Sequence, residues 1–204
     1  MTETLLAVFA KHWTPGGVKT RLAASVGETQ AANYYRDFLA TTLRRFEAVA
    51  DVRAVVFTPE ARREEFAALS GQSWQLIPQA DGDLGQRLAA FLAAALLKIA
   101  RRVVILGADS PTLPFEYVQE AFGRLDSNPV VLGPSGDGGY YLLGVSGAVP
   151  PIFDHMPWSE PALLAATLER LAANGIAAHQ LPPWYDIDDA DDLKRYLAEH
   201  HTQT

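Results

Sequence analysis

The sequence predicts an α/β protein, a three-layer sandwich in which helices cover both faces of a mixed, mostly parallel sheet. Two observations support this fold class. Short apolar runs alternate with longer helical patterns along most of the 204 residues, which is the rhythm of strand–helix–strand crossover units. The run at 103–106 consists of Val, Val, Ile and Leu without polar alternation, as expected of a strand that is buried on both faces. A chain of this length is expected to fold as a single domain, residues 1–204.

The first part of the chain shows the alternation most clearly. Each apolar run has the length of one strand, and each helical pattern that follows it is longer. The predicted strands lie at 5–10, 52–58, 74–78 and 103–106, and the predicted helices lie within 28–49, 61–69, 84–100 and 114–125.

The pattern changes after Pro129. Apolar runs at 130–133 and 140–144 are separated by only six residues, whereas parallel neighbours need a connection of about a dozen or more. The second run is therefore expected to be antiparallel, which makes the sheet mixed. An irregular stretch at 150–161 follows, with Ser159 expected to cap the next helix. The remaining expected elements are a helix through residue 171, a strand at 177–181 and a helix from residue 189.

The composition excludes several classes of function. The chain has no cysteine, so thiol catalysis, iron–sulfur ligation and disulfides are excluded. A net charge of -7 argues against nucleic-acid binding, which needs a broad basic face. No segment approaches the ~20 apolar residues of a membrane span, and the start at Met1 lacks the features of a signal peptide. We therefore expect a cytoplasmic protein; its oligomeric state stays open.

Asp109 is the strongest candidate for a functional residue. It follows the buried strand in the segment Gly107-Ala108-Asp109-Ser110-Pro111, and Pro111 prevents simple continuation of the strand. Asp109 should therefore lie at the carboxyl end of a central strand, where open parallel sheets bind their ligands. The alternative is an aspartate that only forms a turn or a helix cap.

The loop after the first strand combines glycines with positive charge. Gly16 and Gly17 allow backbone amides to approach an anion. Lys11, Lys19 and Arg21 supply the charge that a polyphosphate requires. The spacing matches neither a Walker loop nor a dinucleotide-binding fingerprint, and a solvated surface turn is the alternative.

Two further loops contain candidate residues. Gln79 lies just past a predicted strand and has both an amide donor and an acceptor, as needed to read the edge of a nucleobase. Gly85 would let that base approach closely, while Asp83 is expected to cap the helix that begins there. Asp137 lies among glycines; it is either part of a hairpin turn or a group that positions or deprotonates a substrate.

The last candidates precede the final helix. Asp189 and Asp192 resemble an N-terminal capping arrangement. Asp186 and Asp188 lie before the helix, two residues apart, and capping does not explain them. Asp109 and Asp188 could share one magnesium ion, because Mg²⁺ typically binds one or two protein carboxylates together with phosphate oxygens and water.

In this order, these motifs resemble the nucleotide-diphospho-sugar transferase superfamily, and most closely a bacterial family of small type-A-like glycosyltransferases also classed as a domain of unknown function. The resemblance implies a Rossmann-like sandwich of the type-A glycosyltransferase kind. The motifs that carry it are Phe9-Ala10-Lys11, Pro15 to Leu22, Gly107 to Pro111, Gly133-Pro134, Asp137 to Leu142 and Pro157-Trp158-Ser159.

The resemblance also implies roles for individual residues. Asp109 matches the metal-binding acid, and Asp188 matches a second metal-contacting residue. Gln79 and Gly85 lie where related nucleotidylyltransferases contact the base. The single Asp109, where glycosyltransferases often have Asp-x-Asp, favours the nucleotidylyltransferase side. The basic loop is also similar to that of phospholactate guanylyltransferases.

Three hypotheses follow. The first is a transferase dependent on Mg²⁺ or Mn²⁺ that moves a sugar from a nucleotide-sugar donor to a small-molecule acceptor, with Asp109 and Asp188 holding the metal. The second uses the same residues for nucleotidylyl transfer from a nucleoside triphosphate, with release of pyrophosphate. The third is a nucleotide-binding protein without catalysis.

Overall fold

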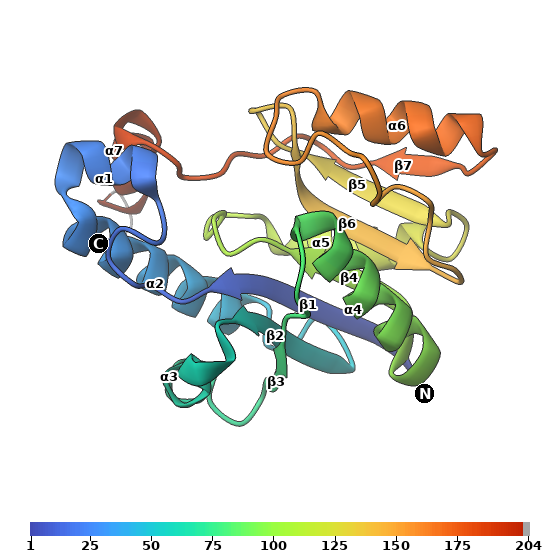
Figure 1. Ribbon diagram of the computed structural model, residues 1–204, viewed down its shortest axis with the longest axis horizontal. Coiled ribbons are helices and arrows are strands. Elements are labelled where there is room, and N and C mark those ends of the chain that lie inside the picture. Colours follow the sequence, from blue (N-terminus) through green and yellow to red (C-terminus); the bar gives the residue numbers. More distant parts are fainter. Residues whose placement is uncertain (202–204) are drawn as a thin grey trace.

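The computed structural model describes residues 1–201, and its centre is a seven-stranded sheet with the strand order β3-β2-β1-β4-β6-β5-β7 (Figure 1). The strands are β1 (Thr2–Lys11), β2 (Val52–Thr58), β3 (Gln75–Pro78), β4 (Ala100–Leu106), β5 (Val130–Pro134), β6 (Tyr140–Ser146) and β7 (Ala178–Gln180). The helices are α1 (Thr20–Val26), α2 (Glu28–Arg45), α3 (Arg63–Ser70), α4 (Leu84–Lys98), α5 (Phe115–Arg124), α6 (Leu163–Ala173) and α7 (Ala190–His201), with a short 3-10 turn at Glu60–Arg62.

The strand pairing confirms the predicted mixed sheet. β1 is parallel to both β2 and β4, β2 is parallel to β3, and β5 is parallel to β7. β6 is antiparallel to β4 and β5, between which it lies. The short connection after β5 therefore forms a hairpin, as expected from its length.

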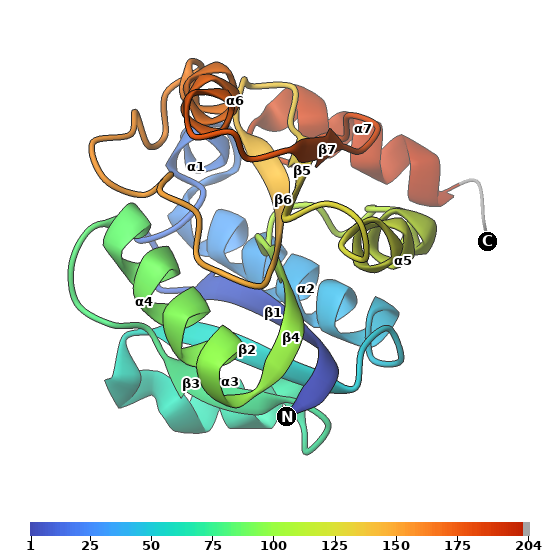
Figure 2. The same ribbon diagram turned by 90° about the vertical axis from the view of Figure 1, so that its right-hand side faces the viewer.

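The helices lie on both faces of the sheet, which confirms the three-layer prediction (Figure 2). Successive residues of each strand point to opposite faces. Leu6 and Val8 of β1 face the core under α2, α3 and α5, whereas Leu5 and Ala7 face the core under α4 and α6. All four side chains are completely buried, because a central parallel strand is covered on both sides.

Two local expectations are wrong. The second half of the basic loop is the helix α1, which begins after Lys19 without a side-chain cap. Ser159 does not cap α6, whose N-cap is Ala162. Two turns intervene, with hydrogen bonds from Glu160 N to Pro157 O and from Leu163 N to Glu160 O, both 3.1 Å. Ser159 instead has φ 66, outside the extended region that an N-cap residue adopts.

Within residues 1–201, the structure contains no helix with the length and apolarity needed to cross a membrane.

Candidate active site

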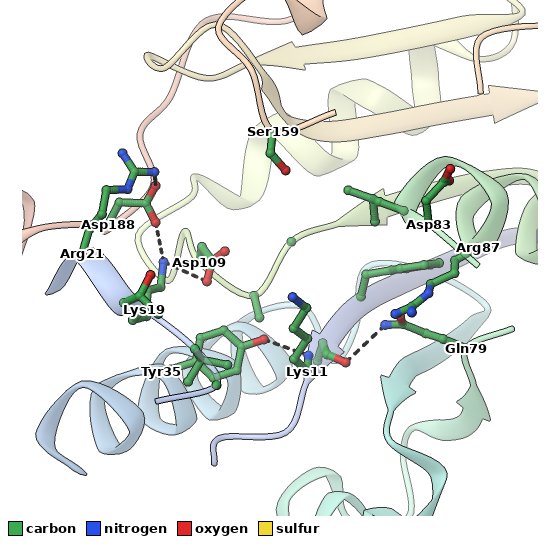
Figure 3. Close-up of a pocket in the computed structure, with 18 of the residues that line it drawn as sticks. Lys11, Lys19, Arg21, Tyr35, Gln79, Asp83, Arg87, Asp109, Ser159 and Asp188 are labelled. Atoms are coloured by element: carbon green, nitrogen blue, oxygen red, sulfur yellow. Dashed lines mark hydrogen bonds and ion pairs between the residues drawn. The ribbon is translucent and has the colours of Figure 1, made fainter. Parts of the chain in front are cut away.

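A pocket of about 670 Å³ opens at the carboxyl ends of β1 and β4, beside the starts of α1 and α4 (Figure 3). This is the edge at which open α/β sheets bind ligands. The pocket brings together seven of the ten residues selected from the sequence: Lys11, Gly17, Lys19, Arg21, Gln79, Asp109 and Asp188. The other three, Gly16, Gly85 and Asp137, do not line it.

Asp109 and Asp188 are joined by a lysine. Lys19 Nζ lies 2.9 Å from Asp109 Oδ1 and 2.8 Å from Asp188 Oδ1. Arg21 Nη2 lies 2.8 Å from the other oxygen of Asp188. The Lys19 side chain is only 4% exposed. Burial opposes its charge, but the two carboxylates dominate and raise the pKa of Lys19 above its ordinary value, so the bridge is an ammonium between two carboxylates.

Each member of this cluster is positioned by a different part of the chain. Lys19 is the N-cap of α1 and has left-handed backbone angles, φ 49 and ψ 47. Asp109 follows β4, and Asp188 precedes α7. Ile187 N donates a hydrogen bond of 3.0 Å to the backbone oxygen of Asp109, so the segment beside α7 is fixed directly to the end of β4.

The side chain of Ile187 anchors the same segment. It is completely buried and packs in a small apolar cluster with Leu22 of α1 and Phe38 of α2. Its neighbour Asp188 is held from the other side, because Asp188 N donates to Asp192 Oδ2 at 3.0 Å. Asp189 and Asp192 cap the start of α7 through backbone hydrogen bonds, which confirms the capping interpretation.

Asp186 lies next to the cluster of Asp109, Lys19 and Asp188, whose charges affect its pKa, although it does not line the pocket. Its carboxylate accepts a hydrogen bond from the Ser110 hydroxyl. Burial and the nearby charge of Asp109 raise the pKa of Asp186 to about 7. The only signal in the sequence was its position two residues before Asp188, which capping does not explain.

The substitution Asp186→Asn should remove a pH-dependent part of the stability. An acid with a pKa of about 7 in the folded protein and about 4 when unfolded binds its proton more tightly in the folded state. The folded state therefore loses stability as the pH rises through this interval. Since Asn does not titrate, the unfolding free energy of the wild type should fall relative to the variant by roughly 1–3 kcal/mol between about pH 5 and pH 8. Denaturant titrations at both pH values measure this change, and a constant difference would contradict the raised pKa.

The two carboxylates offer ligands suited to Mg²⁺ or Mn²⁺, but not a closed metal site. Among the side chains that the structure describes, no three or more His, Cys, Asp or Glu residues are arranged to hold a metal ion. Asp109 Oδ1 is buried without a directed hydrogen bond, although the Lys19 ammonium pairs with it by charge. Mg²⁺ commonly takes one or two protein carboxylates and completes its shell with phosphate and water. The donor set fits such an ion if Lys19 moves aside.

Lys11 and Tyr35 lie between this cluster and the start of α4. The backbone N–H of Lys11 donates to the Tyr35 hydroxyl at 3.1 Å, and the Lys11 side chain extends into the pocket (Figure 3). Burial, together with the charge of Asp109, raises the pKa of Tyr35 well above its ordinary value. Lys11 and Tyr35 thus add one cationic and one neutral hydrogen-bond donor to the pocket, beside the carboxylates.

Gln79 forms hydrogen bonds to three of the elements that surround the pocket. Its Nε2 donates to the backbone oxygens of Ala10 and Val56, at 3.2 and 2.9 Å. Its Oε1 accepts from Arg87 Nη1 at 3.3 Å. The amide therefore ties β1 and β2 to α4, which leaves less of it to read a nucleobase. Nearby, Asp83 caps α4 in a capping box with Gln86, as predicted.

Each of the three selected glycines makes close contacts within the protein. A Cβ at Gly85 would lie 2.4 Å from Trp158 Nε1 and 2.5 Å from Phe153 O, so this glycine makes room for the loop before α6. Gly16 has φ +77 and faces the Glu28 carboxylate. Gly17 N donates to Thr14 O at 2.8 Å, so that amide is already occupied within the turn.

Asp137 lies in the turn between β5 and β6. Its Oδ1 accepts hydrogen bonds from the Ser135 hydroxyl and from Gly139 N, the latter at 3.0 Å. The next residue, Gly138, has φ +89 and packs so tightly that a Cβ would lie 2.1 Å from Pro161 O. The hairpin interpretation accounts for these contacts.

Gly85→Ala should destabilise the protein. The added methyl group would collide with the Trp158 ring and with the backbone at Phe153, so the loop or α4 must shift, and overpacking of this kind costs about 1–3 kcal/mol. Denaturant unfolding measures the loss. Gly123→Ala is the matched control in a helix, because nothing lies within 4 Å of its Cβ position. Equal stability of the two variants would show that the loop does not pack on Gly85 in solution.

Known proteins with a similar sequence or structure have the same fold. The family model described as "Uncharacterized protein conserved in bacteria (DUF2064)" matches residues 42–160. No significant match is found among curated proteins. A Desulfovibrio desulfuricans G20 protein, provisionally assigned as a nucleotide-diphospho-sugar transferase, is 32% identical with a TM-score of 0.93, over 100% of this chain and 90% of that one.

More distant structures share the fold alone. A nucleotidyl transferase from Methanothermobacter is 15% identical with a TM-score of 0.66, over 100% of both chains. A Mycobacterium tuberculosis H37Rv protein solved in complex with manganese is 16% identical with a TM-score of 0.58, over 97% of this chain and 99% of that one. The predicted similarity to nucleotide-diphospho-sugar transferases and nucleotidyltransferases is thus confirmed at the level of fold and named neighbours.

Proposed function

We propose that this chain, which belongs to the bacterial protein family DUF2064, is a transferase that uses a nucleotide-activated donor. The observation that carries the proposal is the cluster of Asp109, Lys19 and Asp188 at the carboxyl end of β4, open to a pocket of about 670 Å³. That volume lies within the roughly 300–1,000 Å³ usual for small-molecule sites. The name of the relative with 32% identity supports the same class of donor.

The residues of the pocket divide into two groups by chemistry. Asp109 and Asp188 would hold Mg²⁺ or Mn²⁺ against the donor diphosphate. When bound, such an ion stabilises the negative charge that develops on the leaving group. Lys11, Lys19 and Arg21 would neutralise the remaining phosphate charge, and Lys19 most strongly, because its side chain is only 4% exposed.

The leading form of the proposal is glycosyl transfer to a small-molecule acceptor. In that reaction an acceptor oxygen forms a bond to the sugar carbon as the bond to the nucleoside diphosphate breaks, so charge develops on the diphosphate beside Lys11 and Lys19. The manganese complex of the distant mycobacterial relative supports the metal. Asp137 and Gly85 are not part of this proposal, because turn and loop contacts already account for them.

A specific observation favours nucleotidylyl transfer as the second candidate. Only Asp109 follows β4 directly, with Gly107 and Ala108 before it, whereas an Asp-x-Asp pair is frequent in the glycosyltransferases that this chain resembles. Here an acceptor phosphate oxygen attacks the α-phosphorus of a nucleoside triphosphate, and the departing pyrophosphate leaves beside Lys11. The name of the Methanothermobacter neighbour is of this type.

One experiment tests the proposal and separates the two reactions. The protein is incubated with MgCl₂ or MnCl₂ and with panels of sugar nucleotides, nucleoside triphosphates and phosphorylated or hydroxylated acceptors, and the released product is identified. A nucleoside diphosphate supports glycosyl transfer, and pyrophosphate supports nucleotidylyl transfer. Metal-dependent nucleotide binding without turnover of any donor would favour the non-catalytic alternative and overturn the proposal.

A further inference from the structure

Lys19 occupies the place between Asp109 and Asp188 that a shared cation would take. Its Nζ lies within 2.9 Å of one oxygen of each carboxylate, and both carboxylates also belong to the wall of the pocket. The Lys19 side chain is almost completely buried, whereas the side chains of Asp109 and Asp188 are 39% and 26% exposed, so water screens this bridge only in part. A protein ammonium and an external metal ion cannot both occupy this position.

The bridge is held more loosely on one side. The contact with Asp188 is a directed hydrogen bond of 2.8 Å, whereas the contact of Lys19 Nζ with Asp109 Oδ1, at 2.9 Å, is less well directed. The Lys19 backbone is in the left-handed region, where the conformational energy of a non-glycine residue is about 1 kcal/mol higher than in the right-handed region. Lys19 has a flexible four-carbon side chain, and it lines the same pocket as Lys11.

A divalent cation should compete effectively for this place only if the displaced ammonium finds another anion. Two carboxylates attract an ion of charge two more strongly than an ammonium, but a displaced Lys19 would leave a buried charge unpaired, which is costly. A donor phosphate in the pocket would remove that cost, because it offers anionic oxygens beside Lys11.

We propose that Lys19 is an exchangeable counter-ion: it fills the cation site of Asp109 and Asp188 in the free protein and transfers to a donor phosphate when a divalent metal enters. This inference rests on the proposed function, because it requires a phosphate-bearing donor. It makes metal and nucleotide binding mutually dependent, so that each binds weakly alone and tightly with the other. Lys19 thereby determines that the site accepts a metal–nucleotide complex rather than either partner by itself.

The test measures binding of Mn²⁺ alone, without any nucleotide, by electron paramagnetic resonance or calorimetry. Lys19→Met keeps the length and apolar stem of the side chain but removes the competing charge. It should bind Mn²⁺ about tenfold more tightly than the wild type, because the Lys19 charge that occupies the place of the metal is then absent, and the site is only partly screened by water. Lys11→Met is the matched control: it removes a pocket lysine that does not bridge the carboxylates, and it should change the affinity by less than about threefold. Equal or weaker Mn²⁺ binding by Lys19→Met would overturn the inference.

A second measurement uses the wild-type protein and does not depend on the folding of a variant. An amine-reactive acetylating reagent should modify Lys19 slowly in the free protein and faster at a saturating concentration of Mn²⁺, while the exposed Lys98 reacts equally in both conditions. Continued protection of Lys19 at saturation would also overturn the inference. Neither measurement requires turnover, so failure to transfer any donor would count against the proposed function without deciding the exchange.

Discussion

Replacement of Asp109 by asparagine should lower kcat about a thousandfold or more, since a metal ion contributes several kcal/mol of charge stabilisation and each ~1.4 kcal/mol corresponds to a factor of ten. The amide has the shape of the carboxylate but not its charge. It therefore binds both the metal and the Lys19 ammonium 2.9 Å away much more weakly. The rate is measured with whichever donor and acceptor the product assay identifies, at saturating metal and substrate.

Asp191→Asn is the matched control for this variant. Asp191 is 89% exposed and pairs with Lys194 on the surface of α7, so the same chemical change there should leave kcat unaltered. Thermal unfolding of both variants shows whether the fold persists. Activity and metal dependence that survive in Asp109→Asn would show that the cluster at the end of β4 is not the reactive centre.

Ile187→Ala should destabilise the protein by about 2–4 kcal/mol, the usual cost of removing a buried aliphatic side chain. Ile187 is completely buried between α1 and α2. Because it lies between Asp186 and Asp188 in the chain, the cavity should also loosen the segment that carries both acids. We therefore expect turnover to fall at temperatures where the variant is still folded, as measured by activity and circular dichroism on the same samples.

Leu5→Ala separates this local effect from general loss of stability. Leu5 is equally buried but lies in the core under α4 and α6, away from the segment before α7. It should cost a similar free energy of unfolding while retaining turnover in the folded state. If the two variants lose activity in parallel, the packing of Ile187 does not specifically position Asp188.

Much of the fold could be predicted from the sequence because the buried strands are defined locally. The strand at 52–58 has its predicted bounds, as Pro59 prevents its extension. The antiparallel direction of β6 followed from the length of one loop. Its place between β4 and β5 did not, because the order of strands depends on long-range pairing that no local pattern records.

The candidate site could be predicted only in part, for a similar reason. The sequence indicated that Asp109 and Asp188 meet at one sheet edge and share a cation, and the structure brings them together. The sequence could not show that Lys19 supplies that cation. The position of Lys19 depends on its left-handed backbone at the start of α1, and the glycines before it made this segment resemble a loop instead of a helix. The sequence could not show that the ring of Trp158 packs against Gly85, because this contact is long-range.

The charge cluster joins residues from the two ends of the chain, because Lys19 and Asp188 are 169 positions apart in the sequence. During synthesis from the N-terminus, the strands β1 to β4 emerge and can pair long before Asp188 leaves the ribosome. Until then Lys19 can pair only with Asp109, and its contact with Asp188 is missing. Such long-range contacts form late because closing a long loop costs the most chain entropy. A growing chain can therefore contain most of the sheet and still lack the cation site. The site can form only after the segment that contains Asp188 has been synthesised.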